Sequence, residues 1–492
     1  MNKPIPWTVK EVTRALGLEQ LDQDSGFAFE GVSTDSRSIH VRDLFVALGG
    51  ERFDGHSFIP DLAERGVKGF VVQRDFPVQN EQEISGSWPD VVFFRVDNTL
   101  TALGDLARFQ RLRAGVKVVA ITGSNGKTST RKMTGGIFHR QFNTLTTMGN
   151  LNNEIGLPLT LLKLSLDHEW AVVEMGMNHG GEIDRLASIA LPDIGVITNT
   201  AACHLEGLGT VEGVARAKAE LLPHIARHGS AVLNLDDSNF EILEAAARTN
   251  DAIREIVCFS TAAEAGDCVK ARQIEPRIGG IGFTLEAPSW GACDLLLPTP
   301  GLFMVSNALA AACAALAAGI SMEIVKKGLE AFEPEPGRMH VVPGFNNTTI
   351  IDDAYNANPG SVTAALETLE RASGVNPSIA VLGDMLELGE QAPGFHRRIG
   401  VLAAESGVAK LYAYGSMACH VIHGAVERGL SREAIMAGTR EEILADLLKE
   451  TPSKAWILVK GSRGMHLEKI VTGLKRPTTI ARGEDMSPHL GN

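Results

Sequence analysis

The chain has 492 residues, several times the usual size of one domain, so we expect three domains, each with its own core. Hydrophobic residues make up 44% and charged residues 21%, values that indicate a globular protein rather than a disordered or fibrous one. A formal net charge of −13 without a basic run argues against a nucleic-acid-binding protein, because phosphate backbones select clustered Lys and Arg.

The terminal and apolar segments predict a cytoplasmic protein. The segment MNKPIPWTVKEVTRALG lacks the apolar core of a signal peptide, and the longest apolar run, 308–320, is too short to cross a bilayer. The six cysteines form no CxxC pair, so we expect reduced thiols. No apolar stripe indicates a subunit interface, and a monomer is the default expectation.

The first predicted domain, residues 1–98, is a small α/β unit. Strand-like segments at 43–48, 69–73 and 91–96 alternate with turn-rich connections.

The second predicted domain, residues 99–334, begins with a helix pattern at 100–113 and a buried strand at 116–122. Apolar strands then alternate with helices, which predicts right-handed βαβ units on a mostly parallel sheet. The strands are expected at 171–177, 194–200 and 230–236, and the helices at 211–226 and 306–319.

The third predicted domain, residues 335–492, repeats this alternation. The segment EPEPGRM, residues 333–339, predicts a linker or hinge before it. Strands are expected at 348–355, 378–385, 410–415 and 455–462, with a helix at 361–372. The pattern is typical of a doubly wound, Rossmann-like sheet, so the fold class of the chain is α/β.

A Gly-rich turn between a strand and a helix predicts a phosphate-binding loop. Its residues are Gly123, Ser124, Asn125, Gly126, Lys127 and Thr128. Glycines let backbone N–H groups approach phosphate oxygens, and the lysine and threonine are suited to β/γ-phosphates and to Mg²⁺. Ile121 stands where the general P-loop has its first glycine, so this loop is a variant. The alternative is an incidental Gly-rich turn.

Three further polar residues follow the loop. Glu174 ends a strand, at the edge where open α/β sheets bind ligands, and His204 and Lys218 come after the next strand. Each also has an ordinary interpretation as a solvated loop or helix side chain.

TGSNGKT, Glu174, His204 and the lysine of AKAE occur in the order found in the Mur ligases, and the chain resembles that family. The resemblance implies ATP bound by the loop, one Mg²⁺ on Thr128 and Glu174, and a second on His204. It also implies that Lys218 is carbamylated and binds metal. The family places Asn307 near the adenine, where Phe303 and Met304 here replace His and Asn.

Several segments resemble the D-alanyl-D-alanine-adding members in particular: GNLNNEIGLPLTLL, EMGMNHGGEI, HLEGLGT, DDAYNANP, VLGDMLELG and LVKGSR. The resemblance implies UDP-N-acetylmuramoyl-tripeptide and D-alanyl-D-alanine as substrates, and a third domain that closes over the second. It assigns Ser36 and Arg37 to the uridine diphosphate. Further contacts are implied for the precursor at Asn150, Asn152 and Asn153, for the nucleotide at Arg338 and Asp353, and for the dipeptide at Asn356 and Asn358.

Three alternatives remain open at this point. The chain could be the ligase that adds the third peptide residue, although the Asp-Asn-Pro-Arg motif usual there is absent. A folylpolyglutamate-type ligase would not need the N-terminal STDSR segment. A nucleotide-switch protein would use the phosphate loop but not Lys218.

Overall fold

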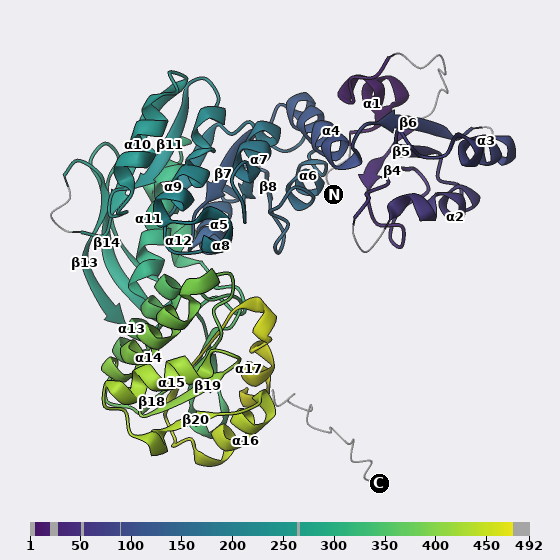
Figure 1. Ribbon diagram of the computed structural model, residues 1–492. Helices are drawn as coiled ribbons and strands as arrows, with labels where there is room; N and C mark the ends of the chain where they lie inside the picture. The colour runs from purple at the N-terminus through teal and green to yellow at the C-terminus, as the bar shows by residue number, and fades with distance from the viewer. Residues whose placement is uncertain (1–4, 20–27, 51–53, 89, 263–265, 476–492) are drawn as a thin grey trace, which may run out of the picture. The chain divides into compact units, whose positions relative to one another are not determined.

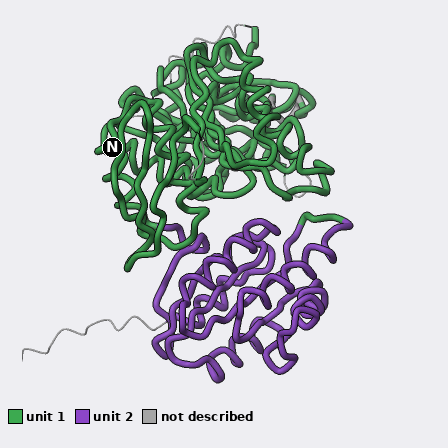
Figure 2. Tube along the Cα trace, turned by 90° about the vertical axis from the view of Figure 1, so that its left-hand side faces the viewer, with its two compact units in different colours: residues 1–333, 387–389 green, residues 334–386, 390–492 purple. Residues whose placement is uncertain are grey.

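The computed structural model describes residues 5–19, 28–50, 54–88, 90–262 and 266–475 (Figure 1). Contacts divide the chain into two compact units, coloured separately in Figure 2. The first comprises residues 1–333 with 387–389, and the second residues 334–386 with 390–492. The division falls in the predicted linker 333–339, and the bounds of the three predicted domains stay predictions.

The first unit opens with a small parallel sheet in the order β3-β4-β5-β6, and β1 pairs antiparallel with β2. Successive strand residues point to opposite faces, so Leu44 and Val46 enter one core and Phe45 enters the other. The strands are β1 (Trp7–Thr8), β2 (Ala28–Phe29), β3 (Gly31–Ser33), β4 (Asp43–Val46), β5 (Gly69–Gln73) and β6 (Val92–Val96). The helices are α1 (Val9–Ala15), α2 (Ile59–Glu64) and α3 (Val78–Ser87).

Helix α4 (Thr99–Ala114) follows this sheet and packs on it. Asn98 caps its N-terminus by accepting from the N–H groups of Leu100 and Thr101, and Gly115 ends it in the left-handed conformation. Leu103 and Leu106 of α4 share one core with Trp7 and the sheet.

A larger sheet carries the phosphate loop. Its described strands have the order β15-β14-β13-β12-β11-β10-β7-β9-β8, parallel except for the two pairings among β13, β14 and β15. The strands are β7 (Lys117–Thr122), β8 (Thr144–Thr146), β9 (Trp170–Glu174), β10 (Ile194–Ile197), β11 (Gly229–Asn234), β12 (Ile253–Ser260), β13 (Val269–Arg277), β14 (Gly280–Ala287) and β15 (Gly291–Leu297). The prediction of a mostly parallel sheet is confirmed.

The helices of this region are α5 (Lys127–Phe138), α6 (Gly156–Leu161), α7 (Glu182–Ala190), α8 (Leu205–Leu208), α9 (Val211–Ala219), α10 (Phe240–Arg248), α11 (Leu302–Ala317) and α12 (Met322–Glu330). The helix predicted over 211–226 ends earlier, at Ala219. Pro223 explains the difference, because it has no N–H to donate to the carbonyl four residues earlier. A short 3₁₀ turn, Leu222–His224, follows instead.

Helix α11 accounts for the long apolar run of the sequence. Twelve of its sixteen residues are buried, most of them in the core of the large sheet, and it packs against α5. Among the described residues, no helix is long and apolar enough to cross a membrane.

The second unit has its own sheet in the order β16-β17-β21-β18-β19-β20, parallel apart from the β16–β17 pair. The strands are β16 (His340–Pro343), β17 (Thr349–Asp353), β18 (Ser378–Gly383), β19 (Lys410–Tyr414), β20 (Ile435–Ala437) and β21 (Trp456–Lys460). The helices are α13 (Pro359–Ser373), α14 (Ala392–Glu405), α15 (Ala418–Glu427), α16 (Arg440–Glu450) and α17 (Glu468–Leu474). The four predicted strands and the predicted helix of this unit are confirmed.

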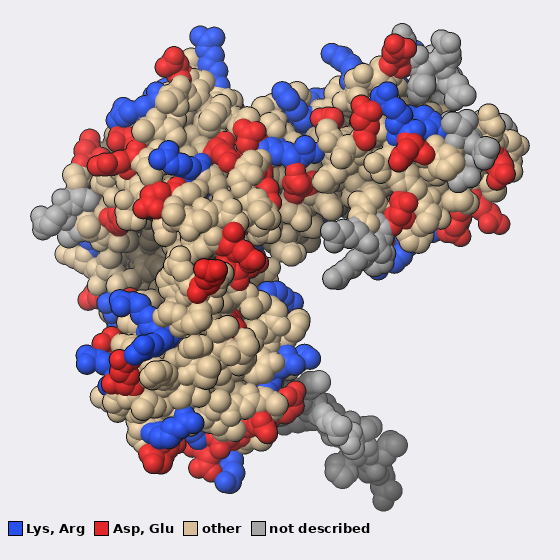
Figure 3. Space-filling model, in the orientation of Figure 1, with Lys and Arg blue, Asp and Glu red and all other residues tan. Residues whose placement is uncertain are grey.

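Figure 3 shows how charged side chains are distributed on one face of the molecule. On the face shown in Figure 3, acidic and basic side chains are interspersed.

Candidate active site

The predicted phosphate loop joins β7 to α5, and its backbone can be built only with glycine at two positions. Gly126 is the N-cap of α5 with φ 82°. A Cβ there would lie 2.0 Å from the amide oxygen of Asn307. Gly123 has φ 150°, and a Cβ would lie 1.8 Å from the hydroxyl of Thr198. The close packing of neighbouring side chains on the loop therefore depends on both glycines.

Residues that follow β10 hold the loop. The N–H of Ser124 donates to the carbonyl of Asn199 at 2.8 Å, and the N–H of Asn125 donates to the Asn199 side chain at 3.0 Å. The Thr198 hydroxyl donates to the carbonyl of Asn125 at 2.6 Å. Adjacent strands of the sheet thus order the loop, as expected of a preformed anion site.

Lys127 and Thr128 begin α5 and have different partners. The Lys127 ammonium donates to the carbonyl of Gly123 at 2.7 Å, so it lies back along the loop. The Thr128 hydroxyl donates to Glu174 Oε2 at 2.9 Å. The structure therefore brings together Thr128 and Glu174, which are 46 residues apart in the sequence.

Glu174 ends β9 with a side chain that is only 2% exposed. Its Oε1 accepts from the Asn152 amide at 2.8 Å, and its backbone N–H donates to the Thr147 hydroxyl at 3.1 Å. The guanidinium of Arg131 lies 3.4 Å from Oε2. A buried carboxylate needs such partners because it has lost its water.

The three asparagines predicted for the precursor have different surroundings. Asn152 contacts Glu174, whereas Asn153 accepts from the N–H of Gly156 at 2.8 Å and so orders the turn into α6. Asn150 is exposed. The sequence could not separate these roles, because all three lie in one short loop.

Lys218 lies on α9 and is 1% exposed. Burial, with a smaller contribution from the charge of Lys127, lowers the pKa of Lys218 to about 7. A substantial fraction of this amine is therefore neutral at physiological pH.

His204 precedes α8 with φ 52°, in the left-handed region. Its Nδ1 lies 2.6 Å from the carboxylate of Glu387, which is in the short segment 387–389 grouped with the first unit. The His204 ring lowers the pKa of this carboxyl. Glu387 was not among the residues predicted from the sequence.

The segment 303–307, which was predicted to lie near the adenine, makes contacts that stabilise the fold. Asn307 packs against Gly126, and its amide lies 3.6 Å from the sulfur of Met304. Met304 is part of the core of the large sheet, and Phe303 packs on that core. The two apolar residues that replace the family's His and Asn therefore contribute to the packing of α11.

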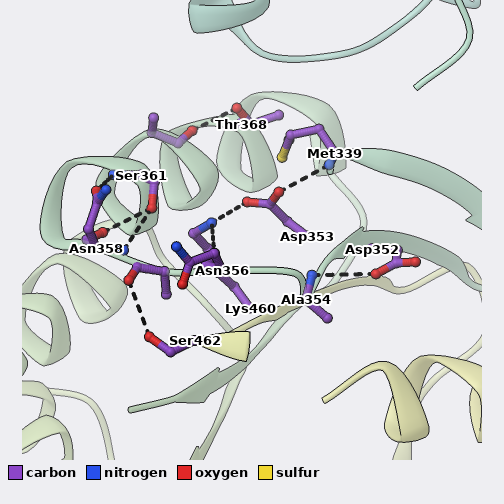
Figure 4. Close-up of polar contacts among 12 residues, drawn as sticks. Met339, Asp352, Asp353, Ala354, Asn356, Asn358, Ser361, Thr368, Lys460 and Ser462 are labelled. Carbon is purple, nitrogen blue, oxygen red and sulfur yellow. Dashed lines mark hydrogen bonds and ion pairs between the residues drawn. The ribbon is translucent and has the colours of Figure 1, made fainter. Parts of the chain in front are cut away.

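In the second unit, Asp353 and Lys460 form a buried ion pair at the ends of neighbouring strands β17 and β21 (Figure 4). Lys460 is 2% exposed and also donates to the carbonyl of Asn356 at 3.1 Å. The other oxygen of Asp353 accepts from the N–H of Met339 at 3.1 Å. The predicted nucleotide ligand Asp353 is thus part of the framework of this unit.

Arg338 stacks on an aromatic ring beside this pair. Its guanidinium carbon lies 4.0 Å from the centre of the Tyr355 ring, and that of Arg463 lies 5.5 Å from the same ring. Two arginines are therefore ordered by one tyrosine, an arrangement suited to an anion.

Asn358 caps α13. Its side chain accepts from the N–H of Ser361 at 2.9 Å, while the Ser361 hydroxyl accepts from the Asn358 N–H at 3.0 Å (Figure 4). The other asparagine predicted for the dipeptide, Asn356, supplies its carbonyl to Lys460.

Ser36 and Arg37 follow β3 in the small sheet. The Arg37 guanidinium pairs with Asp35 through two contacts of 2.9 Å, while its side chain stays 87% exposed. The Arg37 side chain lowers the pKa of Asp35 to about 2. The carbonyl of Ser36 accepts from Arg65 at 2.9 Å.

Comparisons with known proteins show the family to which the chain belongs. Family models match residues 121–315 as a Mur ligase middle domain, 337–463 as a Mur ligase glutamate ligase domain and 28–111 as a Mur ligase family catalytic domain. The UDP-N-acetylmuramoyl-tripeptide--D-alanyl-D-alanine ligase of Escherichia coli is 35% identical over 474 residues, which cover 96% of this chain and 99% of the relative. The chain belongs to the Mur ligase family.

Solved Mur ligase structures agree. MurF from Acinetobacter baumannii has a TM-score of 0.85 at 33% identity, covering 96% of this chain and 99% of its own. MurF from Thermotoga maritima, solved in complex with ADP, has a TM-score of 0.78 at 26% identity, covering 90% of this chain and 96% of its own. The predicted α/β fold class is confirmed.

Besides Glu387, two residues of this Mur ligase, Arg131 and Lys460, were not predicted from the sequence. Arg131 follows the phosphate loop on α5, and Lys460 ends β21. Lys460 lies in the segment LVKGSR, and a lysine at the end of an apolar strand was the available signal. For Arg131 no signal was available, because its meaning depends on Glu174, 43 residues later in the chain.

Proposed function

We propose that this Mur ligase joins D-alanyl-D-alanine to UDP-N-acetylmuramoyl-tripeptide at the expense of ATP. The observation that carries the proposal is the end-to-end similarity to a ligase of that name. The hydrogen bond between Thr128 and Glu174 and the buried amine of Lys218 support it. The product is an amide in a peptidoglycan precursor.

The chemistry requires two displacements, because a carboxylate is a poor electrophile. The terminal carboxylate of the tripeptide attacks the γ-phosphorus of ATP, the bond to the β-phosphate oxygen breaks, and ADP and an acyl phosphate result. The amine of the dipeptide then attacks the acyl carbon. Inorganic phosphate leaves and the new amide nitrogen loses a proton.

Lys127 has the role of a charge clamp in this proposal. Its flexible ammonium lies at the loop that would hold the phosphates, where negative charge accumulates in the transition state. The ammonium would exchange its loop carbonyl partners for phosphate oxygens.

Thr128 and Glu174 fit a magnesium ion. Their oxygens are 2.9 Å apart and buried, and Mg²⁺ usually takes one or two protein oxygens, with phosphates and waters completing its shell. No group of three His, Cys, Asp or Glu residues suited to a metal occurs among the described residues, which is consistent with a site that ATP itself completes. The bound ion would neutralise charge on the phosphates.

His204 and Lys218 are proposed as ligands of a second magnesium. A neutral lysine amine can attack CO₂ and release a proton, which gives a carbamate with carboxylate-like oxygens. The pKa of about 7 for Lys218 supports this assignment, because the reacting form is the neutral amine.

The substrate contacts remain proposals as well. Ser36 and Arg37 are assigned to the uridine diphosphate, and Arg338, Asp353 and Asn307 to the nucleotide. Asn150, Asn152 and Asn153 are assigned to the precursor, and Asn356 and Asn358 to the dipeptide. The Arg37 guanidinium is exposed and pairs with Asp35 through two of its nitrogens, which leaves the third for a phosphate.

The deciding experiment measures phosphate release from ATP with UDP-N-acetylmuramoyl-tripeptide and either D-alanyl-D-alanine or single amino acids. Turnover that requires the dipeptide is the expected result. Turnover with a single diamino acid on a dipeptide precursor would assign the chain to the sister ligase. Release that ignores both substrates would favour a nucleotide switch.

A further inference from the structure

Arg131 is a buried cation next to the proposed metal site. It lies on α5, one turn after Thr128, and its side chain is 6% exposed. Burying a guanidinium is costly unless anions or carbonyls compensate for the lost water. Its partners therefore indicate what it does.

The Arg131 guanidinium contacts two segments at once. Its Nη1 donates to the carbonyl of Thr147, and its Nε lies 3.4 Å from Glu174 Oε2. Thr147 in turn accepts, through its hydroxyl, the backbone N–H of Glu174. One side chain thus ties the helix of the phosphate loop to the end of β9 and to the loop after β8.

Two further side chains hold the Glu174 carboxylate. Thr128 donates to Oε2, and Asn152, which lies five residues beyond Thr147, donates to Oε1. Both oxygens of Glu174 are therefore directed by neighbours before any ligand arrives. Preorganisation of this kind reduces the reorganisation that a bound cation would require.

We propose that Arg131 is a positioning residue that sets the orientation of the Glu174 carboxylate for a divalent cation. It also holds the segment 147–153, which carries Asn152, at the proposed precursor site. The inference rests on the proposed function for the role of the metal. Arg131 itself touches neither metal nor substrate.

The test measures Mn²⁺ binding in the presence of ADP, by electron paramagnetic resonance of free Mn²⁺. Arg131→Gln should raise the dissociation constant of Mn²⁺ about tenfold or more, the size of effect typical of a lost partner of a metal ligand. Lys132→Gln is the matched control. It removes the same charge from the next position of α5, and its dissociation constant should equal that of the wild type.

A second variant keeps the test valid if Arg131→Gln fails to fold. Arg131→Lys retains the charge but cannot span both partners, so Mn²⁺ binding should weaken by a smaller factor than in Arg131→Gln. Circular dichroism verifies that each variant is folded. Wild-type Mn²⁺ binding in Arg131→Lys, or equal losses in Arg131→Gln and Lys132→Gln, would overturn the inference.

Kinetics provide a second readout. Arg131→Lys should raise the KM for the UDP-linked precursor more than the KM for the dipeptide, because segment 147–153 is the part it holds. Equal changes in both KM values would contradict that role. The Mn²⁺ titration needs no ligase activity, so a wild type that fails to use the dipeptide would defeat the proposed function and leave the metal result interpretable.

Discussion

Among the described residues, Lys218 in the first unit and Lys460 in the second are the least exposed lysines, and their charges have different surroundings. Lys460 forms an ion pair with Asp353 and donates to a backbone carbonyl. Lys218 is equally buried, and its pKa falls to about 7. A buried ammonium with a close carboxylate contributes to the framework. The pKa of Lys218 is lowered because burial and, to a smaller extent, the charge of Lys127 disfavour its protonated form, and its neutral amine is available for chemistry.

The largest expected effect is the loss of stability on breaking the ion pair between Lys460 and Asp353. Lys460→Met leaves Asp353 buried without its cation, and should destabilise the second unit by about 3–5 kcal/mol. Hydrogen exchange at the amides of β17 and β21 measures this loss. The double variant Asp353→Leu/Lys460→Met should regain much of it, and Lys469→Met, an exposed change in α17, should have no effect. Equal exchange in Lys460→Met and the wild type would show that the pair contributes little.

The next effect concerns catalysis. Lys218→Ala should lower kcat by about 100-fold or more, as expected for the loss of a group that stabilises charge on the transferring phosphoryl. Added formate or acetate should restore part of the rate if a carbamate was lost. The exposed variant Lys163→Ala serves as control. ¹³C NMR with labelled bicarbonate should show a carbamate signal in the wild type, and its absence at pH 7–8 would rule out the modification.

The smallest effect, taken over a single pH unit, is a pH dependence of stability. Between pH 7 and 10.5 Lys218 is deprotonated in the folded chain but protonated in the unfolded chain. Because the unfolded state then binds more protons, this group makes stability rise with pH in that window, by at most about 1.4 kcal/mol per pH unit. In CO₂-free buffer the difference between the wild type and Lys218→Met should show this rise. A flat difference would mean that the amine stays charged.

The sequence was sufficient to predict local features whose signal is contained in a few consecutive residues. The strand, glycine-rich turn and helix at 117–138 are one example, because hydrophobic periodicity and the Gly-Lys-Thr triplet are local. The alternation of strands and helices was sufficient for the fold class. Asn152 and Asn153 show what the sequence could not predict. They are neighbours of the same residue type, yet Asn152 contacts Glu174 and Asn153 contacts the N–H of Gly156.

Only the tertiary structure decided which charges meet. Lys460 and Asp353 are 107 residues apart and pair because β17 and β21 are neighbours in a sheet whose order differs from the chain order. The same holds for Arg131 and Glu174, and for the proximity of Lys127 that contributes to the lowered pKa of Lys218. Electrostatic energy depends on distance and burial, and neither is contained in sequence spacing. The sequence by itself determined the family, the elements and the phosphate loop, and the fold determined which buried lysine serves the framework and which is suited to chemistry.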